Sequence, residues 1–61
     1  MKPNFVIPKY RRGHKVADKS GKLWHVISIS PLRDTYLYVL ESDDGKYRNT
    51  EPEYNLTKHH D

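Results

Sequence analysis

The residues of this chain with the clearest chemical potential are its cations and its large aromatic side chains. Residues 1–22 carry seven Lys and Arg residues against Asp18 alone, a balance of +6, whereas residues 23–61 have a balance of −3. Cationic side chains attract phosphates, and aromatic rings near them can stack on bases. We therefore predict a nucleic-acid-binding surface made of nine residues: Tyr10, Arg11, Arg12, Lys15, Lys19, Lys22, Tyr36, Tyr47 and Arg48.

Three alternative roles fit the same charges and rings. A basic tail can simply keep a small domain solvated, and aromatic residues on neighbouring strands can form a ladder that stabilises the sheet. A protein partner is the third, because the C-terminal part carries acidic residues that would attract a basic or extended segment: Glu41, Asp43, Glu51 and Glu53. The chain is thus predicted to be a binding or assembly module, with nucleic acid or a host protein as its partner.

Catalytic and metal-binding patterns are weak in this sequence. Asp43 and Asp44 are adjacent carboxylates, but acids before Gly45 are typical of a hairpin turn. The two His residues and the Asp of residues 59–61 cannot fill a tetrahedral zinc site alone. The three glycines lie in separate turns, and the absence of cysteine removes thiolate ligands and thiol nucleophiles. We expect a protein that is not an enzyme and has no cofactor or metal.

Five short strands would have to position these side chains. The alternating apolar residues of 23–30 and the aromatic and branched residues of 36–42 are typical of strands. Shorter extended segments are predicted at residues 14–18, at residues 46–49 and around Leu56. No segment has a 3.6-residue apolar period long enough for a helix, so the predicted fold class is all-β.

Turn residues separate the predicted strands. Residues 19–22 and 43–45 each contain a glycine, which takes positive φ angles at low cost. Residues 31–34 are expected to end the pairing of the second strand, and residues 50–53 to form a single helical turn with Pro52 near its first position. Five short strands with one late 3-10 turn predict a small, highly curved antiparallel barrel.

The predicted core follows from the strand pattern. Strict alternation puts Leu23, His25, Ile27 and Ile29 on one face of the second strand and the residues between them on the other. The expected core members are Val16, Trp24 or its neighbours Val26 and Ile27, Ile29, Tyr38, Leu40 and Leu56. Residues 5–7 are three adjacent apolar side chains (Phe5, Val6 and Ile7), which we expect to fold back on the barrel.

Half of the chain resembles a known family. The sequences Gly-His-Lys-Val at 13–16, Lys-Ser-Gly at 19–21, Trp24 and Tyr-Val-Leu-Glu-Ser at 38–42 resemble the SH3-like barrel of the plasmid-borne type II dihydrofolate reductases. In that family a Val-Gln-Ile-Tyr strand lines the central pore of a tetramer. The equivalent stretch here, residues 47–50, lacks this sequence. The resemblance therefore implies the fold, and a diverged reductase remains an alternative.

A shorter similarity concerns the end of the chain. Residues 53–56 are similar to the Glu-x-x-Leu ending of many small SH3-like proteins of phages and mobile elements. This implies an accessory protein of a phage, a plasmid or a bacterium.

The predicted organisation is a single domain. Residues 1–12, with two prolines, form an extended basic lead-in, residues 13–58 the barrel, and residues 59–61 a frayed tail. No apolar run approaches the roughly 20 residues that cross a bilayer, and the N-terminus lacks the apolar region of a signal peptide. We expect a soluble, cytoplasmic protein without membrane contact, and the oligomeric state stays open.

Overall fold

A computed structural model describes residues 7–59 of the chain. Within this range five antiparallel strands form one sheet, accompanied by a single 3-10 turn. The elements are β1 (Lys15–Ala17), β2 (Leu23–Leu32), β3 (Thr35–Glu41), β4 (Arg48–Pro52), η1 (Glu53–Asn55) and β5 (Thr57–Lys58). The all-β prediction, with its 3-10 turn before the last strand, is confirmed. Residues 7–59 contain no helix with the length and apolarity to span a membrane.

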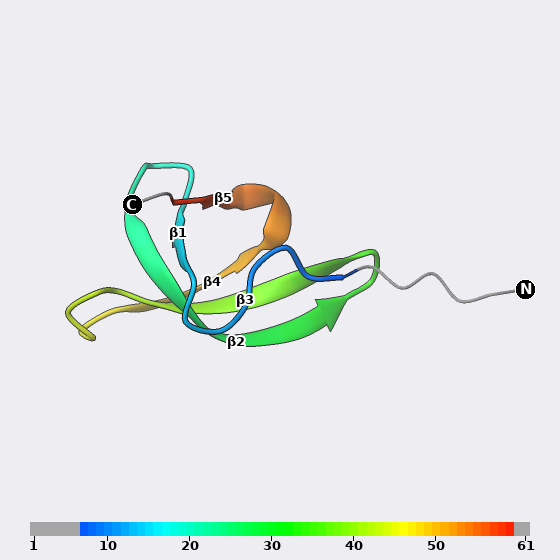
Figure 1. Cartoon of the computed structure of the whole chain (residues 1–61), viewed down its shortest axis with the longest axis horizontal. Helices are drawn as coiled ribbons and strands as arrows, with labels where there is room; N and C mark the ends of the chain where they lie inside the picture. Colours follow the sequence, from blue (N-terminus) through cyan, green and yellow to red (C-terminus); the bar gives the residue numbers. More distant parts are fainter. Residues whose placement is uncertain (1–6, 60–61) are drawn as a thin grey trace, which may run out of the picture.

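The long strand β2 organises the sheet, whose order is β4-β3-β2-β1-β5. Residues 23–25 of β2 pair with β1, and residues 25–32 pair with β3. Figure 1 shows β2 and β3 as a long twisted ribbon, with β1 and β5 at one end of it. The turn η1 connects the edge strands β4 and β5, so it brings the two edges of the curved sheet into one region.

One irregularity in β2 corrects the predicted faces of this strand. Val26 pairs with Leu40 and Ser28 pairs with Val39, so Ile27 is an extra residue in a β-bulge. Val26 is buried, and beyond the bulge Ile29 packs against the same core. The prediction of strict alternation over residues 23–30 was wrong, because the bulge shifts the period by one residue.

The β2–β3 hairpin is also longer than predicted. Pro31 pairs with Tyr36, and Leu32 pairs with Thr35. The prediction that residues 31–34 stop the pairing was wrong, since only Arg33 and Asp34 form the turn. Proline is tolerated here because the other side of β2 has no ladder partner at this point in the described residues, so no partner strand needs its missing N–H.

The connection to the last strand is shifted along the chain. β4 continues to Pro52, and the 3-10 turn begins at Glu53 instead of Thr50. Pro52 has an extended conformation, with φ −72° and ψ 158°, and it precedes the turn. The predicted helical turn over residues 50–53 is thus corrected to Glu53–Asn55.

Among the buried residues of the core, Tyr10 is the one that the sequence did not lead us to expect. The buried members of the core are Tyr10, Val16, Trp24, Val26, Tyr38, Leu40 and Leu56, with Ile29 and Tyr36 packed against them. The other predicted core residues are confirmed in this cluster, except that Ile27 is only half-buried.

Tyr10 comes from the segment predicted as a lead-in. Its ring meets the Tyr38 ring edge-on, with 5.5 Å between centroids, and its hydroxyl donates to the carbonyl of Leu56 at 3.1 Å. Ile7, by contrast, is 78% exposed and does not fold back, while Phe5 and Val6 lie outside the described residues. The packed part of the chain therefore includes residue 10.

Candidate binding site at the β1–β2 turn

Asp18 organises the turn between β1 and β2. Its Oδ1 accepts hydrogen bonds from the backbone N–H groups of Ser20 and Lys22, at 2.9 and 3.0 Å, and from the Ser20 hydroxyl at 2.6 Å. Its Oδ2 accepts the indole N–H of Trp24 at 3.0 Å. These bonds, with that of the Ser20 hydroxyl the strongest, lower the pKa of Asp18 to about 2. A charged carboxylate thus ties the turn to a core ring.

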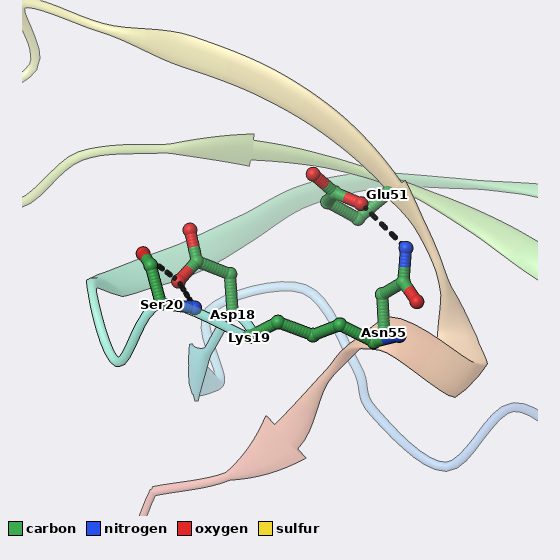
Figure 2. Close-up of a pocket in the computed structure, with 5 residues that line it drawn as sticks. All are labelled: Asp18, Lys19, Ser20, Glu51 and Asn55. Carbon is green, nitrogen blue, oxygen red and sulfur yellow. Dashed lines mark hydrogen bonds between the residues drawn. The ribbon is translucent and has the colours of Figure 1, made fainter.

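A pocket of about 260 Å³ lies beside this turn. Asp18, Lys19 and Ser20 line it from the turn, and Glu51 of β4 and Asn55 of η1 line it from the other side. Figure 2 shows the Lys19 side chain extending from the turn in the direction of Asn55. Two segments that are remote in sequence therefore form this pocket together.

Glu51 is held in place by two neutral side chains. Its Oε1 accepts the amide N–H of Asn55 at 3.0 Å, and its Oε2 accepts that of Asn49 at 2.8 Å. An ionised carboxylate has about four acceptor positions, so Glu51 keeps capacity for a further donor. Within residues 7–59, neither Glu51 nor Asp18 has an ion-pair partner. The pocket thus holds two fixed carboxylates that are not paired with a cation.

Lys22 occupies a different position next to the same turn. Its ammonium lies 4.7 Å from the centroid of the Trp24 ring and 4.7 Å from that of the Tyr47 ring. Both distances are within the range of a cation–π interaction. Lys22 and Tyr47 were predicted to contact nucleic acid, and here they contact each other.

An ionic cluster lies across the sheet from β1 to β4. Lys15 is 3.4 Å from Asp43, and the Nε of Arg48 is 3.4 Å from Glu41. His25 lies between the two acids, with Nε2 at 3.4 Å from Glu41 and Nδ1 at 3.8 Å from Asp43. The cations Lys15 and Arg48 are therefore partly neutralised, which weakens their attraction for phosphate.

The nine predicted nucleic-acid contacts have different surroundings in the structure. The prediction for Tyr10 needs correction, because this residue is only 4% exposed and is not accessible to a ligand. Tyr36 is half-buried against the core. Arg11, Arg12 and Lys19 are exposed, without an ion-pair partner in the described part of the chain. Of the predicted cations, only these three remain fully available.

The acidic residues predicted to bind a protein partner also have different surroundings in the structure. Glu41 and Asp43 belong to the ionic cluster, and Glu53 accepts the hydroxyl of Tyr38 at 2.7 Å. Glu51 lines the pocket. Of the four acids, Glu51 is thus the one that faces a possible binding cavity.

Sequence reasoning missed most of the pocket. Asp18 followed by Ser20 and Gly21 is a typical pattern for a turn capped by an aspartate, so this half could have been found. Asn49 and Asn55 gave no signal, because their contact with Glu51 depends on where β4 ends and η1 begins.

No family model, no curated protein and no solved structure matches the chain. Residues 47–50 are the expected equivalent of the reductase strand. In the structure Tyr47 precedes β4, and the other three residues lie within this strand.

Proposed function

We propose that this protein is a non-enzymatic binding module whose pocket beside the β1–β2 turn receives a cationic side chain of an extended protein partner. The supporting observation is the pair of carboxylates, Asp18 and Glu51, that line one pocket and are held by neutral donors. The two negative charges of these carboxylates exceed the single positive charge of Lys19, which also lines the pocket. A guanidinium or ammonium group entering the pocket would form charge-assisted hydrogen bonds with Glu51.

The position of the pocket at a sheet edge supports an extended partner. β4 pairs with β3 on one side only, and it is the last strand of the sheet on that side. Such an edge presents unpaired backbone groups, to which an extended chain can add as a further strand. Glu51 lies on this edge strand and lines the pocket. A partner chain that pairs with β4 would therefore bring its own side chains to the pocket.

The test is the affinity of two short peptides of equal length, one of alternating Arg and Ser and the other of alternating Glu and Ser, measured by calorimetry. We expect the Arg peptide to bind and the Glu peptide not to bind. The substitution Glu51→Gln keeps the shape and removes the charge, and it should weaken binding about tenfold.

Asp34→Asn is the matched control, because it removes one negative charge from the exposed tip of the β2–β3 hairpin. It should leave the affinity within about twofold of the unchanged protein. An equal loss in both variants would show general charge attraction instead of a pocket, and an Arg peptide that does not bind at all would refute the proposal.

Nucleic acid is the second candidate, favoured by the exposed Arg11 and Arg12 without ion-pair partners in residues 7–59. Fluorescence anisotropy with short single-stranded DNA and RNA should show binding that weakens steeply with salt. Replacing Arg11 and Arg12 by Gln should reduce it much more than replacing the paired Lys15 and Arg48. Absence of binding at roughly tens of micromolar and low salt would exclude this function.

A further inference from the structure

Two aromatic rings from different parts of the chain face one cation. Trp24 lies near the start of β2, and Tyr47 precedes β4, yet both ring centroids lie 4.7 Å from the ammonium of Lys22. We refer to Trp24 and Tyr47 as the aromatic pair. A cation between two rings gains electrostatic attraction from both faces. The arrangement is chemically that of a cation-binding site, with a side chain of the protein as its occupant.

The aromatic pair is fixed by contacts that do not involve the Lys22 side chain. Trp24 is 5% exposed, and its indole N–H is bonded to Asp18 at 3.0 Å. The backbone N–H of Tyr47 donates to the Ser42 hydroxyl at 3.0 Å, and its carbonyl accepts from the Ser42 N–H at 2.9 Å. The backbone that carries each ring should therefore stay in place when Lys22 leaves.

The carboxylate of Asp44 is held by Ser42, the same residue that positions Tyr47. The Ser42 hydroxyl donates to Asp44 at 2.6 Å, and the Lys46 N–H donates to it at 3.0 Å. These hydrogen bonds, the Ser42 bond first, lower the pKa of Asp44, and the positive charge of Lys22 lowers it further. Two rings and a nearby carboxylate favour a cation over a neutral group.

Lys22 is an exchangeable occupant. It lies at the exposed β1–β2 turn on a flexible four-carbon chain, and its ammonium is strongly hydrated, which opposes insertion between rings. An alkylated ammonium group sheds water more easily and is the type of cation that aromatic cages bind. We propose that the aromatic pair is a binding site for quaternary or methylated ammonium groups, which Lys22 fills in the free protein. This site is separate from the pocket of the proposed function.

The test uses the fluorescence of Trp24, the single tryptophan of the chain, during titration with tetramethylammonium chloride. Sodium chloride at equal ionic strength is the blank. The unchanged protein should give a saturable change, and Lys22→Ala should bind about two- to fivefold tighter because its competitor is gone. The variants Tyr47→Ala and Tyr47→Leu should lose the response.

Two matched variants show whether the fluorescence change comes from binding at the aromatic pair. Tyr54→Ala removes a tyrosine of η1 that is 75% exposed, and it should keep the response. Glu51→Gln should also keep it, so a failure of the pocket proposal is distinguishable from a failure here. A peptide with trimethyllysine should bind more tightly than its unmethylated form, and its affinity compared with that of tetramethylammonium tells a protein-bound ammonium from a free one as the preferred source.

Two results would overturn the proposal. The first is a titration of Lys22→Ala that follows the sodium chloride blank. The second is equal binding by the unchanged protein and by both Tyr47 variants, each shown to be folded by circular dichroism.

Discussion

At the scale of single residues, Asp18 carries the most interactions in the candidate site. Its carboxylate accepts four hydrogen bonds, three from its own turn and one from Trp24. We predict that Asp18→Asn lowers the thermal unfolding midpoint by several degrees, because an amide cannot accept at both ends. Calorimetry of this variant against Asp34→Asn, which removes an equal charge at the exposed hairpin tip, checks the prediction. Equal midpoints in the two variants would contradict it.

The same residue should make stability depend on acid. Folding holds the pKa of Asp18 at about 2, below its ordinary value of 3.8. A lowered pKa means that the stabilisation is complete above pH 3.8 and disappears as the pH falls toward 2. Unfolding midpoints measured through this range should fall for the unchanged protein and vary less for Asp18→Asn.

Tyr38 links the core to η1 by its hydroxyl. The group donates to Glu53 at 2.7 Å and accepts the N–H of Tyr10 at 3.4 Å. We predict that Tyr38→Phe lowers the free energy of unfolding by about 1 to 3 kcal/mol, because it leaves these partners unsatisfied while the ring still fills the core. Urea unfolding measures this loss, and Tyr54→Phe on the exposed face of η1 is the control. A loss no greater than that of the control would contradict the role of the hydroxyl.

Alkaline pH tests the same hydrogen bond, because here stability should fall as the pH rises. Burial, and then the hydrogen bond to Glu53, raise the pKa of Tyr38 to about 12. A raised pKa means that the stabilisation is complete below pH 10 and is lost as the pH rises toward 12. The Tyr38→Phe variant should therefore lose less stability in this range than the unchanged protein.

At the scale of elements, the sequence predicted strands better than their joints. The strand pattern of residues 36–42 located the buried Tyr38 and Leu40. The bulge at Ile27 carries no local signal, because an extra residue is defined only against the partner strand β3. Pro31 does not stop the pairing, since its missing N–H matters only where a second strand is adjacent. Register and edges are properties of the assembled sheet, and a single strand does not encode them.

The β2–β3 turn contains a strained backbone conformation that a substitution can relieve. Arg33 has a φ of 50°, the one positive φ of a non-glycine residue in residues 7–59. A side chain in this conformation costs about 1 to 2 kcal/mol, and glycine avoids it at an entropic cost of roughly 0.5 to 1 kcal/mol. We predict that Arg33→Gly raises the free energy of unfolding by about 0.5 to 1 kcal/mol.

Asp34→Gly is the control for this turn. Asp34 has no positive φ, so the same replacement one residue later should lower the free energy of unfolding. Chemical denaturation of the two variants measures both effects. A gain for Asp34→Gly, or a loss for Arg33→Gly, would show that the turn conformation is not the cause.

At the scale of the whole molecule, the basic and acidic parts of the sequence do not form two separate surfaces of opposite charge. Lys15 and Arg48 are far apart in the chain but meet the same ionic cluster, and Lys22 lies between two rings. The net charge of +3 therefore describes the available surface poorly. Charge balance along a sequence predicts attraction only for cations that folding leaves unpaired, and pairing is decided by the tertiary contacts.

The limits of the folded domain follow from Tyr10. A boundary at residue 13 would remove a ring that is 4% exposed and that contacts Tyr38 and Leu56. Losing a buried aromatic side chain costs about 3 to 5 kcal/mol, whereas a chain of 61 residues has a total stability of roughly 3 to 9 kcal/mol. We predict that the fragment 13–61 is largely unfolded at room temperature, and that Tyr10→Ala in the full chain loses most of the same stability.

Amide NMR spectra and thermal unfolding followed by circular dichroism measure this prediction. Tyr10→Phe keeps the ring and loses only the bond to the Leu56 carbonyl, so it should cost about 1 kcal/mol and remain folded. The ordering matters more than each value, since it assigns the loss to the buried ring and not to the basic residues removed with it. A fragment 13–61 with dispersed amide signals and a midpoint near that of the full chain would show that the sheet forms its core without Tyr10, and the domain would then begin at Gly13.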